Sequence, residues 1–214
     1  MIVSSTGGDF KPIPEGAYIA TCVRLIDMGT QITTFQGADK LQRKVLVVWE
    51  VPEEMVEFDG EQRPALIMQR YTASLSDKAT LRKHLEAWRG RRFTDDELKG
   101  FDLKNVLGKP CQIQVIHSEN GAYANIASIM AMPKGATPPD IYHPLVNFSL
   151  DEGEFSEGIY DGLSDKLKAQ ISTSPEYKAR TGQTEAKPSD RGSPEHFPAD
   201  MDDEIPFATN WSLR

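Results

Sequence analysis

The sequence predicts a mainly β protein with one principal helix, followed by a largely disordered, acidic C-terminal tail. Five short segments have the composition and alternation of β-strands. Between the third and fourth segments, the apolar period changes to that of an amphipathic helix. Residues 172–214 are rich in Ser, Pro, Gly and charged residues, so burial cannot offset the entropy lost on ordering them.

The first three strands come before the helix and are rich in β-branched and aromatic residues. They are expected at residues 16–31, 44–51 and 65–74. The polar stretch 33–43 is expected to be a loop between the first two. Pro52 is expected to end the second strand, and Asp59-Gly60 signals a turn within residues 52–64.

One amphipathic helix is expected at residues 76–90, with Ser76 as its N-cap and Gly90 as its C-terminal stop. Its apolar stripe consists of Leu81, Leu85 and Trp88. Trp49 shares strand parity with neighbouring valines, so both tryptophans are expected in the core.

The remaining elements of the body are a second, short helix and a hairpin. The helix, at 94–100, begins with a capping box formed by Thr94 and Glu97. Two strands, 111–118 and 122–132, flank a Gly-containing turn. The order β-β-β-α-β-β matches the OB-fold, a five-stranded barrel with a helix between strands three and four. A generic α+β sheet or another small barrel is the alternative.

Charge and composition divide the chain into three parts. Residues 1–136 form the OB-like body and hold 17 basic and 17 acidic residues. Residues 137–171 are expected to be a linker with a docked segment and a short helix near 159–171. Residues 172–214 form the disordered acidic tail. The net charge of −8 therefore lies entirely after residue 136.

No catalytic, metal-binding or targeting motif is found in the sequence. Cys22 and Cys111 are expected to be reduced and buried, without a disulfide or a zinc site. No signal peptide or membrane-spanning segment is expected, so the protein is expected to be soluble and cytoplasmic. Neither enzymatic activity nor a cofactor is predicted, although a nuclease with dispersed carboxylates remains an alternative.

Candidate contacts to a nucleic-acid strand follow from the OB-like arrangement. Such a barrel presents strands two and three, and the loops after strands one and four, to its ligand. Single strands are held by cations on phosphates and rings on bases. The candidates are Phe35, Lys40, Arg43, Lys44, Arg70, Tyr71, Arg89, Arg91, Arg92 and Tyr123.

Among these candidates, Phe35 is the strongest stacking candidate because it lies in a polar loop. Tyr71 and Tyr123 are equally compatible with the core. The Arg89–Arg92 cluster is compatible with a solvated helix end.

The C-terminal tip resembles that of bacterial single-stranded DNA-binding proteins, in which acids precede Ile-Pro-Phe. The matching residues are Asp202, Asp203, Glu204, Ile205, Pro206 and Phe207. The resemblance implies that these residues bind replication, recombination or repair proteins. In that family Phe is the last residue, whereas residues 208–214 follow it here. The overall layout is more similar to single-stranded DNA-binding proteins of tailed bacteriophages.

The resulting expectation is a non-enzymatic, sequence-tolerant single-stranded DNA-binding protein that acts in phage DNA replication or recombination inside the bacterial host cell. Its acidic tip would recruit partner proteins, and a homo-oligomer is compatible with the sequence. A protein-interaction adaptor whose barrel binds no nucleic acid is the main alternative.

Overall fold

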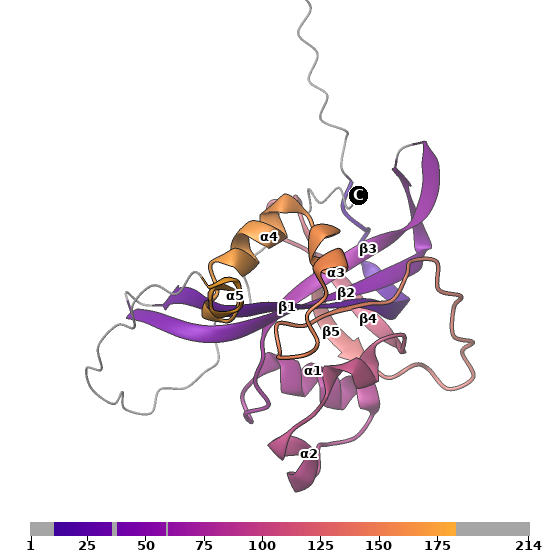
Figure 1. Cartoon of the computed structure of the whole chain (residues 1–214). Coiled ribbons are helices and arrows are strands. Elements are labelled where there is room, and N and C mark those ends of the chain that lie inside the picture. The colour runs from indigo at the N-terminus through magenta and orange to yellow at the C-terminus, as the bar shows by residue number, and fades with distance from the viewer. Residues whose placement is uncertain (1–10, 36–37, 59, 183–214) are drawn as a thin grey trace, which may run out of the picture.

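The protein is mainly β, with a six-stranded sheet and five short α-helices in the part of the chain that the structure describes. A computed structural model describes residues 11–35, 38–58 and 60–182 (Figure 1). The strands are β1 (Gly16–Phe35), β2 (Ala38–Phe58), β3 (Glu61–Thr72), β4 (Pro110–His117), β5 (Ala124–Met130) and β6 (Val146–Phe148). The helices are α1 (Thr80–Arg89), α2 (Asp95–Lys99), the 3₁₀ turn η1 (Leu103–Val106), α3 (Glu157–Asp161), α4 (Asp165–Ser172) and α5 (Pro175–Thr181).

The long strand β1 organises the sheet, whose order is β3-β2-β1-β4-β5. Its first residues pair with β4 and the remainder pairs with β2, both antiparallel, while β6 pairs with β1 in parallel. The predicted sequence of three strands, a helix and two strands is confirmed. Within the described residues no ladder joins β3 to β5, so the hydrogen-bonded sheet is open.

Two hairpin arms extend from the sheet where loops were predicted. The β1–β2 ladder continues to Phe35 opposite Ala38, so the expected loop at 33–43 is wrong. Its Thr and Gln residues suit a hairpin exposed on both faces. β2 also continues past Pro52, because the register shifts between Val51 and Met55. A bulge of this kind needs no ladder N–H from proline.

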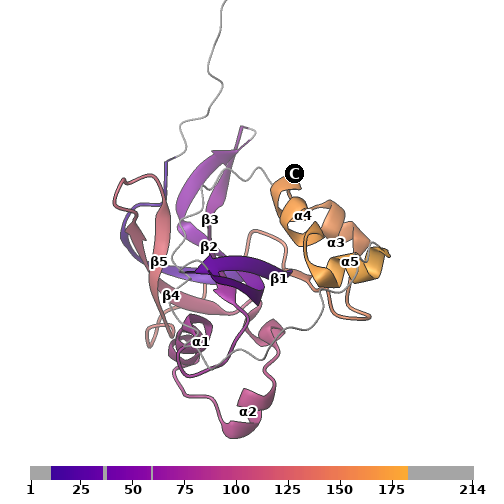
Figure 2. The ribbon, with the colours of Figure 1, turned by 90° about the vertical axis from the view of Figure 1, so that its left-hand side faces the viewer.

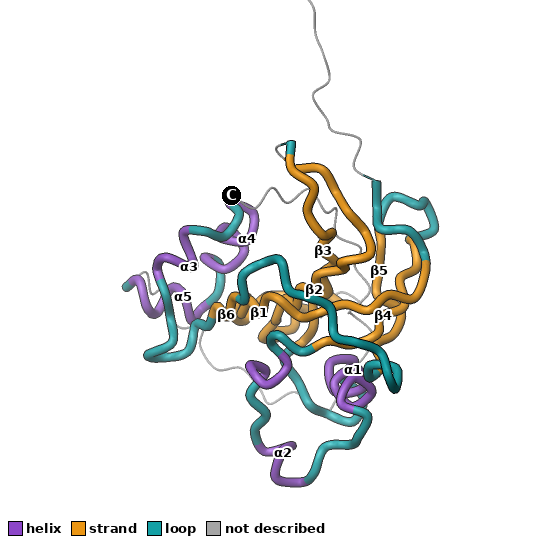
Figure 3. The backbone as a smooth tube through the Cα atoms, turned by 90° about the vertical axis from the view of Figure 1, so that its right-hand side faces the viewer, coloured by secondary structure: helices purple, strands orange, loops and turns teal. Residues whose placement is uncertain are grey.

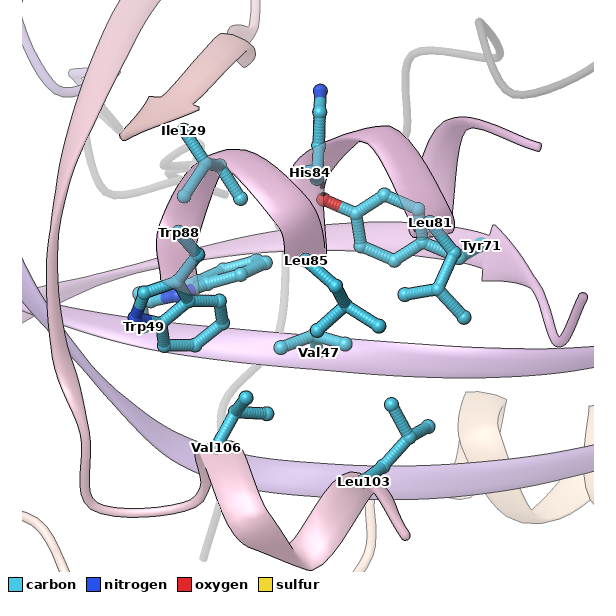
Figure 4. Close-up of a pocket in the computed structure, with 10 residues that line it drawn as sticks. All are labelled: Val47, Trp49, Tyr71, Leu81, His84, Leu85, Trp88, Leu103, Val106 and Ile129. Atoms are coloured by element: carbon cyan, nitrogen blue, oxygen red, sulfur yellow. Dashed lines mark hydrogen bonds between the residues drawn. The ribbon is translucent and has the colours of Figure 1, made fainter. Parts of the chain in front are cut away.

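The inner face of the sheet packs against α1. The core between them includes Trp49 of β2, Tyr71 of β3 and Trp88 of α1, and the ring centroids of Trp49 and Trp88 are 5.8 Å apart. Figure 4 shows Leu85 of α1 directed toward Val47 of β2. The predictions that both tryptophans belong to the core are confirmed.

The predicted ends of α1 and α2, the two α-helices between β3 and β4, are confirmed in part. α1 begins after Ala79, which provides no side-chain cap, so the predicted Ser76 N-cap is wrong. Gly90 ends α1 in the left-handed conformation as expected. The capping box of Thr94 and Glu97 at the start of α2 is confirmed.

The outer face of β1, β2 and β3 is covered by residues 146–181, here called the C-terminal layer. Its buried residues Phe148, Leu167 and Ile171 form a second core with Val23 of β1 and Val48 of β2. Figure 2 shows α3, α4 and α5 together on one side of β1 and β2, opposite β4 and β5. The middle of β1 and β2 is therefore buried on both faces.

Close contacts fix the C-terminal layer to β1. The Thr30 amide and hydroxyl donate to the Glu176 carboxylate at 2.9 and 2.5 Å. Gly29 has a φ of +67°, and a Cβ there would lie 2.5 Å from Ser174. Residues 172–182 were expected to belong to a disordered tail, but they include α5 and pack on the sheet. The predicted tail from 183 onward lies outside the described residues.

Candidate nucleic-acid interface

Three of the predicted cations lie at the junction between the sheet and the C-terminal layer. Arg43 donates to Asp27 and, at 2.6 Å, to Asp151. These bonds, first to Asp27 and then to Asp151, raise the pKa of Arg43. Lys44 is buried and donates to the Thr72 hydroxyl at 2.8 Å. Arg70 donates to the Gln170 side chain at 2.6 Å, and burial lowers its pKa.

The role of Arg43, Lys44 and Arg70 as DNA contacts stays a prediction, but these bonds restrict how freely their side chains can reach a phosphate. Each is held by the protein itself, and two of the partners, Asp151 and Gln170, lie in the C-terminal layer. The layer covers the face that an OB-type barrel normally presents to its ligand.

A second group of predicted cations lies at the corner between α1 and α2 (Figure 3). Arg89 and Arg91 both donate to Glu97. Hydrogen bonds from Arg91, and then from the Thr94 amide, lower the pKa of Glu97 to about 2. Arg89 also lies over the Phe93 ring, 4.4 Å from its centroid.

Arg89 therefore has a structural role, which corrects its assignment as a phosphate contact. Arg91 is exposed, although it forms an ion pair with the Glu97 carboxylate that also binds Arg89. Arg92, the next residue, is exposed too.

The two predicted tyrosines differ in accessibility. Tyr71 is 1% exposed, and its hydroxyl lies 2.8 Å from His84 Nδ1. It cannot stack on a base, so this prediction is wrong. Tyr123 is half-buried beside the β4–β5 turn, where its amide donates to the Ser118 hydroxyl at 3.1 Å.

The β1–β2 arm carries the last two predicted contacts. Phe35 lies opposite Ala38 at its end, and Lys40 is half-buried opposite Thr33. The Phe35 side chain is outside the described part of the structure. The predicted contacts are therefore distributed over separate parts of the fold and do not form one surface.

A segment that the sequence did not single out crosses the outer face of the sheet. Residues 141–145, here called the strap, lie between β5 and the C-terminal layer, and Figure 1 shows this connection crossing the strands. The strap is held by Glu50 of β2, which is completely buried. The Glu50 carboxylate accepts from the amides of Tyr142 and His143 at 2.9 and 2.7 Å. His143 Nδ1 lies 2.6 Å from the same carboxylate.

The backbone of the strap is thus fixed, while most of its side chains other than His143 remain exposed. Tyr142 is 55% exposed, Leu145 is 49% exposed and Ile141 is 41% exposed. Two features of the sequence could have indicated this site. Glu50 interrupts the otherwise apolar run at residues 45–51, and Tyr142 is an aromatic residue within a Pro-rich connection. A buried carboxylate needs hydrogen-bond donors.

Cations lie close to the strap. Lys109 is exposed, and its carbonyl accepts from the Cys22 amide at 3.2 Å. A Cβ on the preceding Gly108 would lie 3.1 Å from Leu145. Arg24 pairs with Val146, the residue directly after the strap, and is half-buried. Neither cation has an ion pair among the described residues.

The described residues contain no group of three or more His, Cys, Asp and Glu side chains able to hold a metal ion. Cys22 and Cys111 are free and buried as expected, and burial raises the pKa of Cys22 to about 12. Within residues 11–182, where described, no helix is both long and apolar enough to cross a membrane. The predicted partner-binding tip, residues 202–207, lies outside the described residues.

Comparisons with known proteins leave the fold and the interface to be interpreted from the chain itself. No protein-family model matches the sequence, and neither the curated proteins nor the solved structures include a match.

Proposed function

We propose that the protein binds single-stranded DNA in a sequence-tolerant way and recruits other proteins through its acidic tip. The main support is the combination of a body whose strand order and helix position resemble the OB-fold with the Asp202–Phe207 motif in the sequence. The resemblance of the sequence layout to single-stranded DNA-binding proteins of tailed bacteriophages supports a role in phage DNA replication or recombination. The barrel-like closure of the sheet through β3 and β5 is part of this proposal.

The neutralised cations make the proposal more specific. Three of the seven predicted cations, Arg43, Arg89 and Arg91, are paired with carboxylates, which reduces the number of predicted phosphate contacts. Each phosphate that a single strand brings into contact with a cation contributes about 0.7 to the slope of log affinity against log salt. The binding is therefore expected to depend on salt, but with a shallow slope, and base stacking should contribute much of the affinity.

The same neutralisation favours a second candidate function, a protein-interaction adaptor whose body binds no nucleic acid. The exposed pair Ile32 and Leu41 on the β1–β2 arm, each 69% exposed and opposite each other, is consistent with a protein contact.

Fluorescence anisotropy distinguishes the two functions. The protein is titrated into labelled oligo-dT and into a labelled duplex, each at about 50 and about 200 mM salt. Tight binding to the single strand supports the proposal. No binding to oligo-dT at low salt refutes it and leaves the adaptor. Incubation with Mg²⁺ or Mn²⁺ in the same assay tests the nuclease alternative, which predicts shortened products.

A further inference from the structure

The strap has the properties of a preorganised stacking site. A base that stacks on a protein needs an exposed aromatic ring whose ordering adds little entropic cost. Tyr142 is 55% exposed, and its own amide is fixed by the buried Glu50. The His143 ring lies edge-on to it, with the centroids 5.1 Å apart, and therefore restricts its position.

The position of the strap on the sheet agrees with such a role. Glu50 pairs with Thr21 of β1 and with Leu66 of β3, so the strap crosses the central strands on their outer face. The C-terminal layer covers the rest of that face with apolar packing. Tyr142 thus presents an aromatic ring above the same strands that an OB-type barrel uses for its ligand.

Charge near the strap suits a polyanion. Lys109 directly precedes β4 and bonds the Cys22 amide through its carbonyl, and the neighbouring Gly108 lies against Leu145. Arg24 lies on β1, opposite Val146. Arg24 lies opposite Val48 in the ladder and so shares the outer face. The buried Glu50 is the carboxylate under the strap, and it is enclosed by two amides and the His143 ring of the strap.

We propose that Tyr142 is a base-stacking residue of the single-stranded DNA site, with Lys109 as a phosphate contact beside it. This inference rests on the proposed function, but it places the site on the strap and not on the residues that the sequence suggested. Ile141 and Leu145 then form the apolar border of the stacked base.

The test uses the full-length chain and labelled oligo-dT. Tyr142→Ala should weaken binding by roughly 5- to 150-fold, the loss of one stacked base. Tyr142→Phe should stay within about twofold, because the ring and not the hydroxyl makes the contact. The Glu50 bonds come from the backbone, so Tyr142→Ala should keep the melting temperature of the wild type. Met55→Ala, on the β2–β3 arm and 52% exposed, is the matched control and should bind like the wild type.

Salt dependence separates the two roles. Lys109→Gln should reduce the salt slope by about 0.7, whereas Tyr142→Ala should leave the slope unchanged. As a second measurement, Tyr142→Trp should show fluorescence quenching when oligo-dT is added.

Failure of this inference is distinguishable from failure of the proposed function. If the wild type binds oligo-dT, but Tyr142→Ala binds equally well and the Tyr142→Trp emission does not change, the strap is not the stacking site and the proposed function stands. If the wild type does not bind oligo-dT at low salt, both proposals are refuted.

Discussion

The contact between Gly29 and Ser174 allows a quantitative test of how the C-terminal layer is attached. Gly29 has a φ of +67°, and a Cβ built on it lies 2.5 Å from both Cβ and Oγ of Ser174. Ser174 cannot turn away without loss, because its hydroxyl donates to the Ile171 carbonyl at 2.7 Å and accepts from the Tyr177 amide at 3.3 Å. The overlap therefore has to be relieved by displacement of α4 and α5.

Two costs add up for Gly29→Ala. The left-handed backbone conformation costs an alanine about 1–2 kcal/mol, and overpacking at a buried contact costs about 1–3 kcal/mol. The free energy of unfolding should thus fall by about 2–5 kcal/mol. Gly121→Ala is the matched control, because Gly121 has the same φ of +67° but nothing within 4 Å of its Cβ position. Gly121→Ala should lower the free energy of unfolding only by the conformational cost of about 1–2 kcal/mol.

Urea denaturation of the two variants and the wild type measures the difference. Limited proteolysis within residues 163–181 reports whether the C-terminal layer has been displaced in Gly29→Ala. Equal losses of stability in Gly29→Ala and Gly121→Ala, with no new cleavage, would show that the layer does not press on β1 as described.

Three further predictions concern the strap, the inner core and the tail. Glu50→Ala should lower the unfolding free energy by about 3–5 kcal/mol, because buried donors of the strap lose their acceptor, whereas the exposed Glu57→Ala should change it by less than about 0.5 kcal/mol in the same urea titration. Burial, with Lys83 as a lesser cause, lowers the pKa of His84 below 6.5. At pH values between the lowered pKa and 6.5, the unfolded chain binds more protons at His84 than the folded chain does. The contribution of His84 to stability is therefore complete above pH 6.5 and is lost as the pH falls. Comparing the wild type with His84→Gln from about pH 7.5 to about pH 5.5 should show the advantage of the wild type decreasing by at most about 1.4 kcal/mol per pH unit; a constant difference contradicts this. Removing residues 199–214, which carry four acids and one arginine, should tighten oligo-dT binding at low salt if the tail competes with DNA, and unchanged affinity would exclude that competition.

The elements that the sequence predicted correctly are those with a local signal. The spacing of Leu81, Leu85 and Trp88 specified the buried face of α1, and Thr94 with Glu97 specified the start of α2. The polar β1–β2 arm had no such signal, because a hairpin exposed on both faces has no apolar alternation.

The sequence of β2 does indicate that something covers its outer face, although strand alternation alone does not reveal this. β2 is apolar at Val47 and also at Leu46 and Val48, so both of its faces require cover. The segment that supplies this cover, residues 146–181, lies far along the chain, and its own sequence shows only short apolar groups separated by polar residues.

The interface was less predictable than the fold. The sequence placed Arg43 in a loop and Arg70 on the third strand, but Asp151 and Gln170, which bind them, are 108 and 100 residues away in the sequence. Whether a cation is free for phosphate depends on these long-range contacts. The strap was missed for a similar reason, since Glu50 and Tyr142 are brought together only by the fold.

The late position of the C-terminal layer in the chain affects how the protein is made. A ribosome completes the strands β1 to β5 before it has synthesised the helices that shield their outer side. During that interval the nascent chain exposes a broad apolar surface, to which chaperones can bind and through which it can aggregate. A product that terminates early, or is cleaved after β5, would keep this surface permanently and become a target for cellular quality control.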